Sequence, residues 1–286
     1  MALNRSEGAR TVGLLSGLLL LAACSNPPYP RGAMEELYPT PPRPQLRQVQ
    51  ALGHTLQMAE MPGTGKTPIV FVHGSPGGWK AWARYLDAPE LSAFGPRIAF
   101  DRPGFGGSGA GDVMLDLRRQ ADVLAAAMPP GPPAILVGHS LGGPLIAWMA
   151  IDHPDKVCGG VMVAGSVAPD LEAPRWYNRI ADTFVAQWVA PKEMLWSNRE
   201  MLVLQTELQK LDAEWPKLKR PLVAIQGMDD SLVDPRTADY LEGRAPRQWM
   251  RVVRAPGLDH FLLWKQRELV TREILSLPCG PDGAKP

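Results

Sequence analysis

The sequence predicts an α/β fold in which a mainly parallel sheet carries helices on both faces. Short apolar runs without polar alternation recur along the chain, as expected for strands buried on both faces, at residues 69–72, 97–100, 134–137, 161–163 and 222–225. Stretches with helical periodicity alternate with these runs, at residues 113–128, 141–153 and 261–275.

The first 23 residues have the pattern of a secretory signal peptide. Arg5 and Arg10 precede an apolar run at residues 12–23, which is too short to span a membrane. The run leads into Leu-Ala-Ala-Cys at residues 21–24, which resembles the lipobox of bacterial lipoproteins. This resemblance implies that Cys24 becomes the mature N-terminus and carries fatty acyl chains such as palmitate, anchoring the protein to a membrane. By the same analogy, Ser25 favours the outer membrane, facing the periplasm. A plain secretory signal with an incidental cysteine is the alternative.

A proline-rich tether is expected at residues 24–45, after the lipidated cysteine. Seven prolines favour extended backbone there, at positions 27, 28, 30, 39, 41, 42 and 44. At ~3.1 Å per residue, such a tether holds the domain up to ~60 Å from the bilayer.

The folded domain is expected at residues 46–286. Residues 46–51 and 55–59 indicate two paired strands and hence an antiparallel edge. A long aromatic-rich segment at about 166–220 interrupts the alternation of strands and helices, and a structureless loop of this length is improbable. We expect a helical cap there. The alternative is a pair of ordinary surface helices packed on the core.

The charge balance excludes one class of partner. The chain has 286 residues, with 30 Lys and Arg against 29 Asp and Glu and a formal net charge of +1. A nucleic-acid-binding domain would show a basic excess, so no nucleic-acid partner is expected.

A nucleophile motif follows the strand predicted at 134–137. Residues 138–142 read Gly-His-Ser-Leu-Gly, which matches G-x-S-x-G, and a helical pattern follows at once. A strand, a sharp turn and a helix form the nucleophile elbow, in which a strained backbone presents the serine hydroxyl. The motif alone is weak, but this context predicts Ser140 as the nucleophile.

A serine nucleophile needs a base and an acid, which follow it in the order acid and then histidine. Only His153 and His260 come after Ser140. His153 ends a predicted helix, where a helix-end role suits it, so His260 is the expected base. Three carboxylates compete for the acid after the strand at 222–225, namely Asp229, Asp230 and Asp234.

The oxyanion of an acyl-transfer intermediate needs two backbone N–H donors. One is expected from Leu141, directly after the nucleophile. The other is expected from Ser75, because Pro76 has no N–H and the loop follows the strand at 69–72. His73 is expected to brace this loop.

These pieces together resemble the α/β-hydrolase superfamily across residues 46–277. The matching segments are 73–76 (His-Gly-Ser-Pro), 101–108 (Asp-Arg-Pro-Gly-Phe-Gly-Gly-Ser), the elbow, the Gly227 turn and His260. The family places its acid three residues after the turn glycine, which selects Asp230. The resemblance implies a serine hydrolase that needs no metal or organic cofactor, but it is much less specific for the substrate. The aromatic cap suggests a small-molecule ester with an apolar group, so a carboxylic ester hydrolase is the expected activity.

Two other functions stay open. The run at 73–78 resembles the His-Gly-Gly-Pro-Gly-Gly of prolyl aminopeptidases, which need cap carboxylates for the substrate ammonium. Glu172, Glu193, Glu200 and Glu207 are available, but they are expected to be surface helix charges. The second alternative is a non-catalytic envelope lipoprotein.

Two further cysteines remain after Cys24. Cys158 begins a predicted strand and Cys279 follows the last predicted helix, and an oxidising envelope permits a disulfide between them. Two separate thiols are the favoured expectation.

Overall fold

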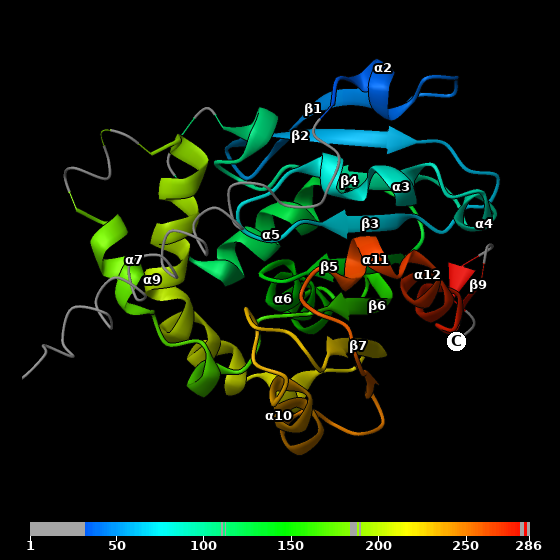
Figure 1. The fold of residues 1–286 in the computed structure, drawn as a ribbon. Coiled ribbons are helices and arrows are strands. Elements are labelled where there is room, and N and C mark those ends of the chain that lie inside the picture. Colours follow the sequence, from blue (N-terminus) through cyan, green and yellow to red (C-terminus); the bar gives the residue numbers. More distant parts are fainter. Residues whose placement is uncertain are drawn as a thin grey trace, which may run out of the picture.

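A sheet of eight strands forms the centre of the molecule, in the order β1-β2-β4-β3-β5-β6-β7-β8 (Figure 1). The computed structural model describes residues 32–109, 111, 113–183, 188, 190–280 and 283–284. The strands are β1 (Gln45–Ala51), β2 (His54–Met61), β3 (Ile69–Val72), β4 (Arg97–Phe100), β5 (Ala134–His139), β6 (Val157–Val163), β7 (Leu222–Gly227) and β8 (Met250–Ala255). Two short strands, β9 (Cys279–Gly280) and β10 (Gly283–Ala284), pair separately.

The pairing confirms a mainly parallel sheet with an antiparallel edge. β1 pairs with β2 and β2 with β4 in antiparallel fashion, whereas every pair from β4 to β8 is parallel. The carboxyl ends of the parallel strands therefore meet at one edge of the sheet. Loops that follow β3, β5, β7 and β8 come together there, although they are far apart in the sequence.

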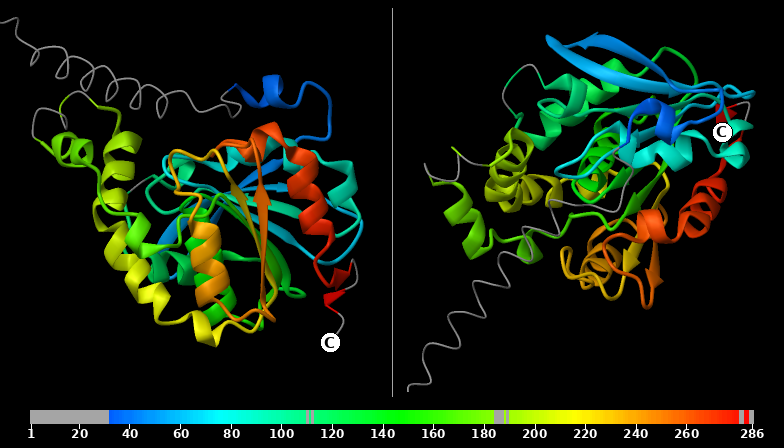
Figure 2. Two further views of the ribbon diagram at one scale, coloured as in Figure 1. Left: turned by 60° about the horizontal axis from the view of Figure 1, so that its bottom comes forward. Right: turned by 45° about the horizontal axis from the view of Figure 1, so that its top comes forward.

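Helices cover both faces of the sheet, as the two turned views in Figure 2 show. Alternate strand residues serve the two faces: Val70 and Val72 join the core under one face, while Ile69 and Phe71 join the core under the other. The first core is closed by α5 (Leu117–Ala127), α6 (Gly142–Asp152), α9 (Lys192–Asp212) and α10 (Thr237–Arg244). The second is closed by α3 (Ala83–Leu86), α4 (Pro89–Ser92), α11 (Leu262–Lys265) and α12 (Arg267–Leu275).

Helices joined by loops make up the described part of the segment between β6 and β7. It contains α7 (Trp176–Ala181) and the long helix α9, which stand together at the left of Figure 1. Leu204, Leu208 and Leu211 of α9 belong to the first core. We call residues 166–220, where the cap was expected, the cap, and its long helix α9 packs on the core.

The amino-terminal part of the described chain lies against the domain. The short helix α2 (Met34–Leu37) leads to Tyr38, which is buried and whose hydroxyl donates to the carbonyl of Ala83 at 2.9 Å. Lys80 Nζ donates to the carbonyl of Gly32 at 2.9 Å. Residues 32–44 therefore differ from the free tether expected at 24–45, because an aromatic anchor docks them.

The expected signal peptide and Cys24 lie outside the described residues. Among the residues that are described, no helix is both long enough and apolar enough to cross a membrane.

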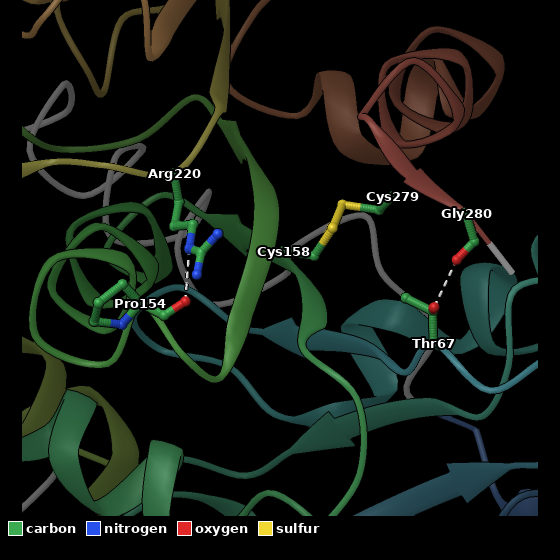
Figure 3. The surroundings of a disulfide bond; sticks show 6 residues. All are labelled: Thr67, Pro154, Cys158, Arg220, Cys279 and Gly280. Carbon is green, nitrogen blue, oxygen red and sulfur yellow. Dashed lines mark hydrogen bonds between the residues drawn. A yellow bond between two sulfur atoms is a disulfide. The ribbon is translucent and has the colours of Figure 1, made fainter. Parts of the chain in front are cut away.

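Cys158 and Cys279 form a disulfide, with their Cα atoms 6.0 Å apart (Figure 3). The expectation of two separate thiols is therefore wrong. The chain turns back after α12, buries Leu277 and brings Cys279 to the start of β6. Thr67 Oγ1 donates to the carbonyl of Gly280 at 2.6 Å (Figure 3). This hydrogen bond joins the same segment to the loop before β3. The bond spans 121 residues, and in the chain-entropy model such a closed loop stabilises the fold by ~4–5 kcal/mol.

Candidate active site

Ser140 directly follows β5 in a sharply turned backbone. Its φ is +53°, in the left-handed region that non-glycine residues rarely adopt. The surroundings fix this conformation: Ser140 N donates to the carbonyl of Val163 at 3.0 Å, and the Ser140 carbonyl accepts from the N–H groups of Gly143 at 2.8 Å and Ser166 at 3.2 Å. The strand, turn and helix expected of a nucleophile elbow are all present.

Two glycines make this turn possible by close backbone approach. A Cβ on Gly138 would lie 2.2 Å from the carbonyl oxygen of Gly142, and a Cβ on Gly142 would lie 2.3 Å from that of Val72. No side chain fits at these distances, so the G-x-S-x-G glycines are required by packing between β5, β3 and α6.

His260 and Asp230 meet at the carboxyl edge of the sheet. His260 Nδ1 lies 2.9 Å from Asp230 Oδ2, and both residues are buried. The other carboxylate oxygen, Asp230 Oδ1, accepts from the backbone N–H groups of Leu232 at 2.8 Å and Val233 at 2.9 Å. Because a carboxylate oxygen accepts in the bond with His260, Nδ1 carries the proton of that bond and Nε2 is the nitrogen left for another partner.

The two competing carboxylates have other surroundings. Asp229 is exposed. Asp234 forms an ion pair with Arg236 at 2.6 Å and accepts from its backbone N–H at 2.9 Å, next to the start of α10. Of these three aspartates, Asp230 is the one that bonds with His260.

His139 contacts His260 through its ring and through a hydrogen bond to its backbone. Its Nε2 lies 3.1 Å from the carbonyl oxygen of His260, and the two ring centroids are 4.8 Å apart. Burial lowers the pKa of His139 to about 3, so its ring is neutral and can donate to that carbonyl. The sequence motif treats this position as variable, so this contact was not expected.

The residues expected to bind an oxyanion flank Ser140. Leu141 follows it and is buried at the start of α6. The loop after β3 approaches from the other side, since a Cβ on Gly74 would lie 2.9 Å from Ser140 Cβ. His73 braces this loop as expected: its Nε2 accepts from the backbone N–H of Arg102 at 2.9 Å. Burial and the Arg102 guanidinium hold the pKa of His73 well below its ordinary value.

A fully buried ion pair joins the cap to this loop. Arg102 donates to both carboxylate oxygens of Glu200 at 2.7 and 3.0 Å, and neither side chain is exposed. Ser75 Oγ donates to the same carboxylate at 2.5 Å. Glu200 shares one helical face with Leu204 and Leu211, which is the signal in the sequence that this carboxylate points inward.

The expectation of surface helix charges on the cap is wrong for Glu200 and Glu207, and Glu172 meets it only in part because it is half-buried and lies outside the helices. Glu200 is buried against Arg102, and Glu207 is buried, accepting from Leu117 N at 3.1 Å and Lys210 Nζ at 2.5 Å. Both face the core because α9 packs on it. Glu193 is exposed, as expected.

Glu172 is half-buried between the end of β6 and α7. Its Oε1 is shielded from solvent and has no hydrogen-bond partner among the described residues. Burial raises its pKa to about 7, with Asp230 contributing in the same direction, while a hydrogen bond with Ser166 and the nearby Arg175 oppose the rise. A carboxyl with such a pKa is half-protonated near neutral pH. Within the described residues, no group of three or more His, Cys, Asp or Glu could hold a metal ion.

Residues 69–276 match the model of the alpha/beta hydrolase family. The chain therefore belongs to the α/β-hydrolase family. The match covers the elbow, Asp230 and His260, whereas the expected lipidation site lies before it.

Several curated relatives are esterases or hydrolases by name. The chain is 34% identical over 256 residues to the pimeloyl-[acyl-carrier protein] methyl ester esterase of Proteus mirabilis. This match covers 75% of the chain and 96% of that protein. It is 34% identical over 113 residues to the pyrethroid hydrolase of Sphingobium wenxiniae, and that match spans 36% of this chain and only 39% of the relative.

Solved structures share the fold. Carboxylesterase CesB from Bacillus subtilis superposes with a TM-score of 0.62 at 16% identity, covering 92% of this chain and 98% of that one. Naproxen esterase from the same organism gives a TM-score of 0.62 at 13% identity, covering 85% and 93%.

The raised pKa of Glu172 makes stability depend on pH. Between its ordinary pKa of 4.5 and about 7, the folded carboxyl keeps its proton while the unfolded one loses it, so this residue's contribution to stability is lost as pH rises through about 7. The free energy of unfolding of Glu172→Gln should equal that of wild type near pH 4.5 and exceed it at pH 8. Urea unfolding at both pH values measures this difference. The exposed control Glu193→Gln should follow wild type, and a Glu172→Gln difference that does not change with pH would contradict this explanation.

Proposed function

We propose that the protein hydrolyses carboxylic esters through a serine acyl-enzyme, with Ser140 as nucleophile, His260 as base and Asp230 as the orienting acid. The observation that supports this most strongly is the bond between His260 Nδ1 and buried Asp230, at the sheet edge where Ser140 stands in its strained turn. The esterase relatives support the choice of an ester as substrate.

The chemistry follows from these positions in two steps. His260 Nε2 takes the Ser140 proton as Oγ attacks the ester carbonyl, and it returns that proton to the departing alcohol when the ester C–O bond breaks. Water then gives a proton to His260 as it attacks the acyl-enzyme, and that proton passes back to Ser140 when the acid leaves. The N–H groups of Leu141 and Ser75 would hold the oxyanion in both steps.

The buried cap carboxylates favour an esterase over a prolyl aminopeptidase. The charge of Glu200 is matched by Arg102, and Glu207 is paired with Lys210, so neither is available for a substrate ammonium. Glu172 Oε1, by contrast, has no hydrogen-bond partner in the part of the chain that the structure describes. A panel of p-nitrophenyl esters and proline aminoacyl amides therefore separates the two activities. The aromatic side chains of the cap suit an ester with an apolar group.

Variants of the triad test the proposal. Ser140→Ala should lower kcat by about 10⁶-fold, and Asp230→Asn by about 10⁴-fold, because the second variant leaves the imidazole in the wrong tautomer. The matched control is Asp229→Asn, which should stay near wild type because Asp229 is exposed. Steady-state kinetics on p-nitrophenyl butyrate, with folding checked by circular dichroism, measures all three. A crippled Asp229→Asn beside an active Asp230→Asn would refute the assignment of the acid.

We also propose that the enzyme is anchored in the bacterial envelope through lipidated Cys24. The segment at 21–24 and the disulfide support this location, since disulfides persist in oxidising compartments. Cys24→Ser should release the protein into the soluble fraction or leave the precursor unprocessed. Membrane fractionation and intact mass measure this, and equal solubility of both proteins would refute the anchor.

A further inference from the structure

The peptide between Gly74 and Ser75 lies beside the proposed nucleophile. A Cβ on Gly74 would come within 2.9 Å of Ser140 Cβ and 3.2 Å of the His139 carbonyl oxygen. The peptide is trans, because the cis bonds of the described chain are Pro41–Pro42 and Ser75–Pro76. In a planar trans peptide the carbonyl and the N–H point in opposite directions, so whatever holds the Gly74 carbonyl also fixes the direction of the Ser75 N–H.

Two buried donors hold that carbonyl. His73 Nδ1 lies 2.7 Å from Gly74 O, and Arg102 Nη2 donates to the same oxygen at 3.0 Å. Donors on the carbonyl also polarise the peptide, which strengthens its N–H as a hydrogen-bond donor.

Arg102 is in turn held by the cap. Glu200 accepts from both of its terminal nitrogens, and the planar guanidinium matches the carboxylate in two parallel bonds. Gln120 completes the arrangement, accepting from Arg102 at 2.8 Å and donating to Glu200 at 3.1 Å. Ser75 Oγ donates to Glu200 Oε2. The Glu200 carboxylate is therefore linked to this peptide twice: through Arg102, which binds the Gly74 carbonyl, and through the side chain of Ser75, the residue that supplies the N–H.

We infer that Glu200 is a positioning residue for the reaction: with Arg102 it aims the Ser75 N–H, so that the cap helix α9 assembles one half of the oxyanion site. This inference rests on the proposed function. Glu200 does not touch the reacting atoms; it acts through Arg102 and Ser75. The oxyanion site is then complete only while α9 is docked on the core.

Glu207 provides a matched control on the same helix. It is also a buried carboxylate, seven residues further along the same helical face, and like Glu200 it accepts from a cation, with the backbone N–H of Leu117 as its second donor. Its partners, Leu117 and Lys210, lie outside the 73–76 loop. Loss of either carboxylate should destabilise the fold, but only loss of Glu200 should disturb the oxyanion donor.

The test compares Glu200→Gln with Glu207→Gln on p-nitrophenyl butyrate. An oxyanion donor acts in the transition state, so Glu200→Gln should lower kcat by about 100-fold with little change in KM. Binding of phenylboronic acid, whose tetrahedral adduct places an oxygen in that site, should weaken in parallel. Glu207→Gln should keep kcat near wild type. The inference is overturned if Glu200→Gln keeps wild-type kcat, or if both variants lose kcat equally.

Ser75→Ala keeps the test decisive if Glu200→Gln does not fold. It preserves the buried ion pair and the Ser75 N–H but removes the hydroxyl tie, and kcat should fall about tenfold, the effect of one hydrogen bond to a charged group. If Glu200→Gln folds, adding Ser75→Ala to it should cost less than tenfold more, because the two side chains act on one peptide. Wild-type kcat in Ser75→Ala would overturn the inference. A wild-type enzyme that hydrolyses none of the esters would instead refute the proposed function, and the inference with it.

Discussion

The left-handed backbone of Ser140 is the constraint on which the site depends. Its three backbone hydrogen bonds join the ends of β5, β6 and α6, and the contacts of Gly138 and Gly142 leave no room for side chains around it. A non-glycine residue in this region is strained by ~1–3 kcal/mol, and such strain persists only where the surroundings over-determine it. Here the buried parallel sheet does so. The same convergence of strand ends carries the loop of Ser75 to one side of Ser140 and brings Asp230 to His260.

Buried charge is the second organising feature. Taking Arg102 and Glu200 out of water costs several kcal/mol per ion, and the bonds between them offset much of this only because the geometry is bidentate and Gln120 and Ser75 satisfy further lone pairs. Replacing a buried ion pair by apolar side chains of similar volume is often neutral or stabilising. The Arg102–Glu200 pair is therefore better explained by its orientation of the 73–76 loop than by a gain in fold stability. Glu172 shows the opposite case: one of its oxygens has no hydrogen-bond partner among the described residues, and burial makes its carboxyl hold its proton to a higher pH.

Much of this architecture follows from sequence patterns. Uninterrupted apolar runs located β3, β4, β5 and β7, and the elbow could be recognised because a strand and a helix flank Ser140. Local patterns left the acid open among three aspartates, and family spacing was needed to choose Asp230. Pairings between distant segments were not predictable: Arg102 and Glu200 are 98 residues apart, and the Cys158–Cys279 bond spans 121. The docking of residues 32–44 through Tyr38 was also not predicted. Prolines indicate extended backbone, but they do not indicate whether a neighbouring aromatic side chain is buried against the domain.

The central claim is that Ser140 is an activated nucleophile, and covalent trapping tests it most directly. The folded protein would be treated with a fluorophosphonate and analysed by intact mass and peptide mapping. The account predicts a single adduct on the peptide that carries Ser140, and no adduct when His260 is replaced by Ala, because a serine hydroxyl is a poor nucleophile without its base. An unlabelled folded protein, or an adduct on another residue, would contradict it.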